Sequence, residues 1–262
     1  MKLPTILSRM YILFILVFVV LLVACGPKPG VDQLSLDKAT LKACPQDVKY
    51  ATKVDLDVSG SGRTPELDPA RLDIIKQQAR TTAICGGHLL VTVFSATSAA
   101  TVALYDDELT LPGATDNARL RRVQKLVDDI SKKVTTAYPP AIKKVSPAQS
   151  DITAQFRLAA EYQTQLGTTY RLRLVILTDG FQTVGRRVTA PIEITKARAV
   201  GMTVNVPRLP DATVTVAGVG KVAAGSAPSS GMTNALIGYW DGVCHRAKAA
   251  QCTVVTDYVA GR

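Results

Sequence analysis

The chain alternates between short runs of apolar residues and longer segments whose apolar positions repeat every three or four residues. The short runs predict strands at 50–58, 88–94, 101–105, 172–177, 213–217 and 253–255. The longer segments predict helices at 65–84, 116–137, 150–166 and 232–243. Strands that alternate with helices in this way indicate an α/β sheet, mostly parallel, with helices on both of its faces.

Two segments change this picture locally. Pro139-Pro140 follows the long helical pattern and is expected to end that helix, because proline lacks the backbone donor that a helix needs. Residues 181–210 combine β-forming residues with Arg and Pro, so we expect a β-rich excursion from the sheet there. The whole domain is expected to cover residues 44–262.

The amino-terminal residues have the pattern of an export signal. Basic residues precede the uncharged run Tyr11–Ala24, which is shorter than the roughly 18–20 residues of a membrane-spanning helix. The run ends in Leu22-Val23-Ala24-Cys25, which resembles the bacterial lipobox. That resemblance implies a signal peptide at 1–24, a lipid on Cys25 and an exported bacterial lipoprotein anchored to the envelope membrane, on its extracytoplasmic side. Ordinary secretory cleavage and an uncleaved anchor are the alternatives. Residues 25–43 are expected to form a flexible tether.

The chain is basic, with a formal net charge of +10. Its basic pairs are scattered, at Arg121-Arg122, Lys132-Lys133, Lys143-Lys144 and Arg186-Arg187. Solvated helix and loop faces account for such pairs, and the sequence contains no nucleic-acid-binding motif. A basic envelope protein is instead suited to acidic partners or anionic lipid.

The candidate chemistry lies where two predicted strands end. Asp57-Val-Ser59-Gly60-Ser61 follows the first strand, and Thr178-Asp179-Gly180 follows the strand at 172–177. In a parallel sheet, ligand sites form at the carboxyl ends of the strands. Carboxylate and hydroxyl oxygens suit Mg²⁺, Mn²⁺ or Ca²⁺. Taken alone, the first loop is equally well explained as a turn that caps the next helix.

With these elements in this order, residues from about 45 to 260 resemble a von Willebrand factor type A domain. That family carries a metal-ion-dependent adhesion site with a D-x-S-x-S loop after the first strand. Asp57, Ser59 and Ser61 match that loop. Asp179 matches the family's second acidic residue, and Thr115 in Gly113-Ala114-Thr115 matches its threonine.

The resemblance implies a Rossmann-like α/β fold and a divalent cation, Mg²⁺ first, with Mn²⁺ or Ca²⁺ as alternatives. Ser59, Ser61 and Thr115 would contact the ion directly, and Asp57 and Asp179 would neutralise it, mainly through water. The implied function is an envelope-anchored binding or adhesion module, not an enzyme, which recognises an acidic group of a partner protein through the cation. A metal-free structural or assembly lipoprotein of the envelope is the competing hypothesis.

Beyond Cys25, the chain has four cysteines, and an even number in an exported protein favours disulfides over metal binding. The sequence alone leaves three connectivities open. In a parallel α/β layout, all four lie at one edge of the sheet: Cys44 before the first strand, Cys85 after the first helix, Cys244 after the last helix and Cys252 at the last strand. We therefore predict the pairs Cys44–Cys85 and Cys244–Cys252.

The main enzymatic alternative is a Mg²⁺-dependent phosphatase. Asp55-Leu56-Asp57 resembles the first motif of haloacid dehalogenase-type phosphatases, in which the first Asp would be the nucleophile. However, no carboxylate follows the strand at 213–217, where that family needs one to hold Mg²⁺. His88 and His245 are the only histidines, and neither belongs to a recognisable catalytic group.

Overall fold

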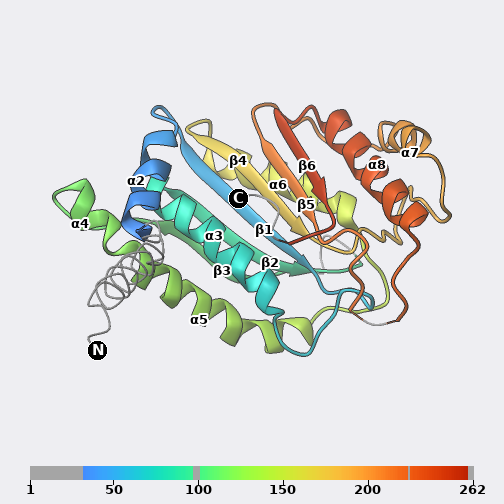
Figure 1. The fold of residues 1–262 in the computed structure, drawn as a ribbon, viewed down its shortest axis with the longest axis horizontal. Coiled ribbons are helices and arrows are strands. Elements are labelled where there is room, and N and C mark those ends of the chain that lie inside the picture. Colours follow the sequence, from blue (N-terminus) through green and yellow to red (C-terminus); the bar gives the residue numbers. More distant parts are fainter. Residues whose placement is uncertain (1–31, 97–100, 224, 259–262) are drawn as a thin grey trace, which may run out of the picture. The chain divides into compact units, whose positions relative to one another are not determined.

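The computed structural model describes residues 32–96, 101–223 and 225–258. The chain divides into two compact units, residues 1–39 and 40–262, and the architecture described here is that of the second. It contains a six-stranded sheet with the order β3-β2-β1-β4-β5-β6, and every neighbouring pair is parallel except β2 and β3 (Figure 1). The strands are β1 (Lys49–Asp57), β2 (Gly87–Phe94), β3 (Thr101–Leu109), β4 (Tyr170–Leu177), β5 (Thr213–Ala217) and β6 (Gln251–Val255). This confirms the predicted α/β, Rossmann-like fold class.

The helices follow the predicted order, and both faces of the sheet carry some of them. They are α2 (Gln33–Ala43), α3 (Pro69–Cys85), α4 (Asp116–Leu120), α5 (Val123–Ile142), α6 (Ile152–Leu166), α7 (Ile194–Gly201) and α8 (Ser230–Ala247). Thr52 of β1 hydrogen-bonds Thr82 of α3, with 2.6 Å between the hydroxyl oxygens. Because side chains alternate along a strand, the neighbouring Ala51 faces the other side, in a core that includes Phe156 of α6 and Trp240 of α8.

Both predicted disulfides are present. Cys44 pairs with Cys85, with 5.2 Å between their Cα atoms, and Cys244 pairs with Cys252, with 6.0 Å between them. The first bond joins the chain just before β1 to the end of α3. The second joins α8 to β6, so each bond ties a helix to the amino-terminal edge of the sheet.

Three local predictions need correction. Residues 33–43 of the expected tether form α2, because Leu, Lys and Ala favour a helix there. The single helix expected at 116–137 is two helices, and the second continues through Pro139 and Pro140 to Ile142. Tyr138, Ala141 and Ile142 are buried, so packing holds this last turn despite the missing donors.

The prediction of a β-rich excursion at 181–210 is also wrong. This segment contains the helix α7, and none of its described residues forms a strand. Helix α7 packs on α8 through glycines: a Cβ atom at Gly201 would lie 2.1 Å from the Tyr239 carbonyl oxygen, and one at Gly242 would lie 2.2 Å from that of Arg198. Close contact between the two helix backbones therefore outweighs the local β propensity of this segment.

We expect Gly242→Ala to lower the free energy of unfolding by about 1–3 kcal/mol, because the added methyl group has no room against α7. The matched control is Gly231→Ala in the same helix, where the new Cβ would meet the Pro191 Cβ at an ordinary contact distance of 3.5 Å. Alanine favours helix over glycine, so the control should be neutral or stabilising. Urea unfolding measures both, and equal effects would contradict this account of the α7–α8 contact.

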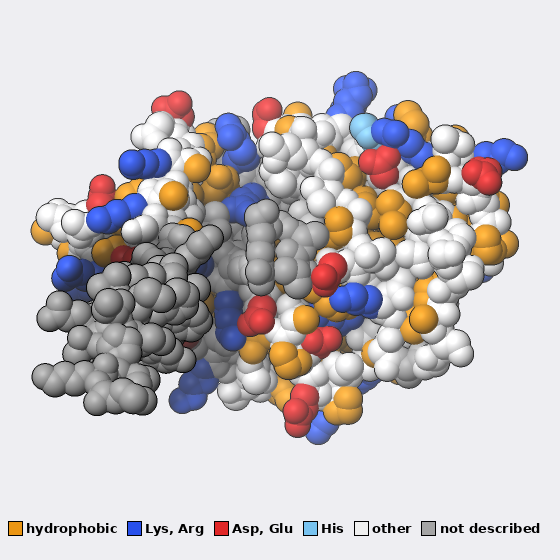
Figure 2. All heavy atoms as spheres, viewed as in Figure 1, with side chains coloured by type: hydrophobic (Ala, Val, Ile, Leu, Met, Phe, Trp, Pro, Cys, Tyr) orange, Lys and Arg blue, Asp and Glu red, His pale blue; other side chains and the backbone are white. Residues whose placement is uncertain are grey.

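The predicted signal peptide (1–24) and the lipid site Cys25 lie outside the described residues. Within the described ranges, no helix has the length and apolar character needed to cross a bilayer. Figure 2 shows Lys and Arg side chains spread over the visible face, with Asp and Glu among them and no single basic block.

Candidate functional site at the carboxyl edge of the sheet

The loops that follow the parallel strands bring the predicted acidic residues together. Asp57 is the last residue of β1 and pairs in register with Phe94, the last residue of β2. Thr178 and Asp179 directly follow β4, whose Leu177 pairs with Leu56. Both carboxylates are fully buried. The sheet thus places two acids that are distant in sequence at the same edge.

The Asp57 carboxylate is held by three hydrogen bonds from three loops. Its Oδ1 accepts from the Ser59 backbone amide at 2.9 Å. Its Oδ2 accepts from the Ser150 hydroxyl at 2.8 Å and from the Thr178 hydroxyl at 2.7 Å. The buried Arg71 of α3 donates to the Asp57 carbonyl oxygen at 2.9 Å. These hydrogen bonds therefore hold the Asp57 side chain in one orientation.

Asp179 is less well satisfied. Its Oδ1 accepts from the Phe181 amide at 2.9 Å. Burial, and then the nearby negative charge of Asp57, raise the pKa of Asp179 to about 6, although Ser61, Phe181 and Arg71 act in the opposite direction. Two buried carboxylates in this arrangement favour either a proton or a cation between them.

Within the described residues, three buried oxygens in the loops that follow the parallel strands have no hydrogen-bond partner. They are the Ser59 Oγ, the Ser95 Oγ and the Asp179 Oδ2, which follow β1, β2 and β4 respectively. Buried polar atoms are normally satisfied, so such atoms call for an explanation. Hydroxyl and carboxylate oxygens are ligands for hard divalent cations, and the residues present therefore fit such an ion. Among the described residues there is no group of three or more His, Cys, Asp or Glu that could hold a metal, so a cation here would depend on hydroxyl ligands.

The structure does not bring Thr115 to this site. Strand β3 runs antiparallel to β2, with its last residue, Leu109, beside Gly87 at the amino end of β2. The segment after β3 therefore leaves from the edge opposite Asp57. Thr115 is exposed and caps α4, where its hydroxyl accepts from the Ala118 amide at 3.2 Å. The prediction of Thr115 as a ligand is wrong in its position.

Ser150, and not Thr115, lies beside Asp57 at this edge. It is fully buried in the turn before α6. Ser150 stands at the start of the predicted helix 150–166, where a serine usually caps the helix. The actual cap is Asp151, whose side chain accepts from the Ala154 amide, and this leaves the Ser150 hydroxyl available for Asp57.

Further contacts brace the loops around the two acids. The Gly220 amide donates to the Asp179 carbonyl oxygen at 2.8 Å, and the Ala223 amide donates to that of Ser61 at 2.6 Å. The indole nitrogen of the buried Trp240 donates to the Gly180 carbonyl oxygen at 3.0 Å. The segment after β5 and the helix α8 thus fix the backbone of the site.

The residues of the alternative enzymatic site lie elsewhere. Asp55 is inside β1, buried and ion-paired with Lys53, not at the edge of the sheet. His88 packs against Tyr162, with 2.9 Å between the ring nitrogen and the hydroxyl. His245 is exposed near Asp241 on α8. Neither histidine reaches the two acids that end β1 and β4.

The raised pKa of Asp179 predicts a stability change with pH in the presence of a chelator. A carboxyl group with a pKa of about 6 when folded and 3.8 when unfolded stabilises the fold below pH 3.8, and this contribution is lost as the pH rises through 6. The loss amounts to about 3 kcal/mol. Asp179→Asn should lack it, so the difference between wild type and variant should change between pH 4 and 7. Parallel unfolding profiles would contradict the predicted shift.

No protein-family model matches the chain, and no curated protein matches it either. Among solved structures, the chain is similar to proximal thread matrix protein 1 from the mussel byssus, with 14% identity over 81% of this chain and a TM-score of 0.41. That match covers only 45% of the mussel protein. The chain is also similar to an aerotolerance-related membrane protein from Bacteroides fragilis, with 14% identity, 80% of this chain and 90% of that chain covered, and a TM-score of 0.37. The values for BatB from Bacteroides thetaiotaomicron are 15%, 80%, 90% and 0.37. These values show neither a shared family nor a shared activity.

Proposed function

We propose that residues 44–262 form a von Willebrand factor type A-like binding module that holds a divalent cation, Mg²⁺ first, at the carboxyl edge of its sheet. Asp57 and Asp179 would supply the negative charge, and Ser59 and Ser61 would supply hydroxyl oxygens. The observation that carries the proposal is the pair of buried carboxylates, together with the Asp179 Oδ2 and the Ser59 Oγ, which have no hydrogen-bond partner in the described part of the chain. A cation would satisfy those oxygens and relieve the repulsion between the two acids.

Ser150 would replace Thr115 in the proposed site. Its hydroxyl hydrogen points to Asp57, which leaves oxygen lone pairs for an ion. When bound, the cation would attract an oxygen ligand from outside, because only two carboxylates neutralise it. We propose that this ligand is an acidic group on a partner protein, and that the module binds it without catalysing a reaction.

The surface beside the site carries both basic and acidic groups. A cavity of about 530 Å³ lies at the same edge, between the loops that follow β1 and β5, and Arg71, Lys221 and Asp68 are among the residues that line it. Lys221 is ion-paired with Asp257, so the charge that favours an acidic partner is that of the chain as a whole. This positive net charge acts at long range. With a lipid on Cys25, the module would present this edge to partners in the bacterial envelope.

Cation-dependent melting tests the proposal, with the full-length protein in a nonionic detergent and Mg²⁺, Mn²⁺, Ca²⁺ or EDTA added. A ligand that binds only the native state stabilises it by about 2.7 kcal/mol at 100 times its dissociation constant. We expect millimolar Mg²⁺ to raise the melting temperature of the wild type, and Ser59→Ala and Asp179→Asn to abolish the rise.

The matched control is Thr115→Ala, which removes a hydroxyl at the opposite edge and should keep the full response to the cation. A wild type that melts identically in Mg²⁺ and in EDTA would overturn the metal proposal and leave the metal-free structural or assembly role. Hydrolysis of a phosphomonoester by the same samples, lost in Asp179→Asn, would instead support an enzyme.

A further inference from the structure

Half of one sheet face has no helix over it among the described elements. Helix α3 contacts β1 and β2, and α5 contacts β2 and β3. In Figure 1, α3 lies across β1 and β2, while β4, β5 and β6 have no labelled helix in front of them. The side chains of β4 on this face include Arg171 and Arg173, whereas the alternate residues Leu172 and Leu174 are buried on the other face.

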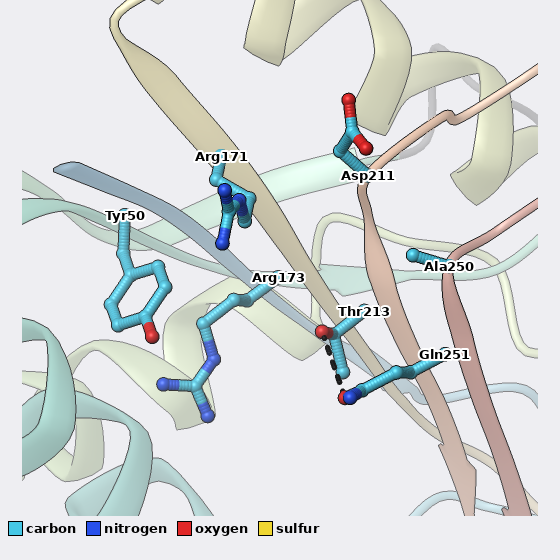
Figure 3. A pocket seen from close by; sticks show the side chains of 7 residues that line it. All are labelled: Tyr50, Arg171, Arg173, Asp211, Thr213, Ala250 and Gln251. Atoms are coloured by element: carbon cyan, nitrogen blue, oxygen red, sulfur yellow. Dashed lines mark hydrogen bonds between the residues drawn. The ribbon is translucent and has the colours of Figure 1, made fainter. Parts of the chain in front are cut away.

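The two arginines line a cavity of about 430 Å³. Arg173, Thr213 and Gln251 are neighbours in register on three parallel strands, so their side chains form one row across the sheet. Figure 3 shows Tyr50 on one side of the two guanidinium groups and the Thr213–Gln251 pair on the other. The Thr213 hydroxyl and the Gln251 side-chain oxygen lie 3.5 Å apart. The cavity is therefore built by residues of four strands.

Among the described residues, the two guanidinium groups in this cavity have no acidic partner. Within the described part of the chain, neither Arg171 nor Arg173 has an ion pair or a side-chain hydrogen bond. Arg173 is half-buried, its guanidinium carbon lies 4.8 Å from the centre of the Tyr50 ring, and burial lowers its pKa. The one acidic residue in the lining, Asp211, is exposed, and Figure 3 shows its carboxylate pointing away from the guanidinium groups.

We propose that this cavity is a binding site for a phosphate group, held by Arg171 and Arg173 with Thr213, Gln251 and Tyr50 as neighbouring polar partners. The planar fork of a guanidinium matches two oxygens of a phosphate. The two guanidinium groups are on alternate residues of one strand, about 7 Å apart along it, so they approach the phosphate from two directions. A phosphate has enough oxygens for both forks and a hydroxyl, whereas a carboxylate has only two.

The site is separate from the proposed cation site. Arg171 pairs in register with Tyr50 near the amino end of β1, whereas Asp57 is at the carboxyl end of the same strand. The chain also enters β1 at the amino edge. If the chain is anchored through Cys25, a phospholipid headgroup is one source of the phosphate, and a phosphate-bearing solute is the other. Both present the same chemistry to the two arginines.

Calorimetric titration of the full-length protein in a nonionic detergent tests the site and separates the two sources. The probes are inorganic phosphate, water-soluble dihexanoyl phosphatidylglycerol and dihexanoyl phosphatidylcholine. We expect saturable binding of at least one of the first two. Arg173→Gln should weaken it by about tenfold or more, because a charge-assisted hydrogen bond to the phosphate is lost. Phosphatidylglycerol bound in preference to inorganic phosphate would identify a headgroup site, and the reverse a solute site.

Three variants make the result specific. Arg171→Gln changes an exposed residue and should weaken binding without affecting the fold, and Arg173→Lys should bind less well than wild type because it lacks the planar fork. Arg246→Gln on α8 removes the same charge outside the cavity and should bind within about twofold of wild type. No binding of either phosphate probe, or equal weakening by Arg246→Gln, would overturn the proposal. Melting of each variant, measured alongside, identifies any loss of fold.

Discussion

Replacing Lys53 with methionine should lower the free energy of unfolding by about 3–5 kcal/mol, because it leaves a buried carboxylate without its counter-ion. The Lys53 side chain is 2% exposed and that of Asp55 is 0% exposed, and the two form an ion pair inside β1. Thr92 of β2 donates a hydrogen bond to the same Asp55 oxygen at 2.6 Å, while the second oxygen has no partner among the residues that the structure describes. Lys53 therefore compensates a charge that the sheet keeps from water.

The double variant Lys53→Met/Asp55→Leu is the control for this prediction. Removing both charges also removes their desolvation cost, so the double variant should recover most of the stability lost in the single one. Chemical unfolding of the full-length protein measures all of these variants. A cost below about 1 kcal/mol for Lys53→Met would mean that water reaches Asp55, through the cavity of about 340 Å³ that Lys53 lines.

The sheet could be predicted because its signals are local. Buried strands such as Leu172–Leu177 are unbroken apolar runs except for Arg173, and the helices between them repeat their apolar positions. The disulfides followed from the same layout, since the α/β alternation puts Cys44, Cys85, Cys244 and Cys252 at one edge. The sequence also predicted Asp57 and Asp179 at the ends of the first and fourth strands. The structure has them as neighbours at the opposite edge.

Thr115 and Ser150 show why the rest of the site was not predictable. The Gly-Ala-Thr segment matched a family motif locally, but its place depends on the direction of β3, which is set by pairing with β2. Ser150 stood before a helix, where serine usually caps the helix and needs no further role. Only the three-dimensional structure shows that its neighbour Asp151 caps α6, while Ser150 donates to Asp57 across 93 positions of sequence.

The prediction for residues 181–210 was wrong for a related reason. Its β-branched residues favour strands locally, but α7 is fixed by contact with α8. Gly238 and Gly242 stand four residues apart on α8, and Cβ atoms there would lie 2.5 Å and 2.2 Å from the carbonyl oxygens of Ile194 and Arg198. A glycine pair at helical spacing was the one signal in the sequence for this close helix–helix contact.

Asp57→Ala should combine a large loss of stability with the loss of any response to cations. The Ser150 and Thr178 hydroxyls and the Ser59 amide would lose their acceptor, and Ser150 and Thr178 are fully buried. An unsatisfied buried donor costs about 1–3 kcal/mol. Hydroxyl groups can rotate to other acceptors, so we expect a total of about 3–5 kcal/mol.

Asp57→Asn separates the structural role of Asp57 from its charge. The amide keeps the shape and an acceptor for the Ser59 amide, and the two hydroxyls can turn to accept from the new NH₂ group. In EDTA we therefore expect Asp57→Asn to unfold within about 1 kcal/mol of wild type. It should nevertheless show no stabilisation by Mg²⁺, because half of the negative charge is gone. The nearby charge of Asp57 also helps to raise the pKa of Asp179, so the stability loss between pH 4 and 7 should become smaller in this variant. Full Mg²⁺ stabilisation in Asp57→Asn would mean that the cation, if one binds, does not depend on this carboxylate.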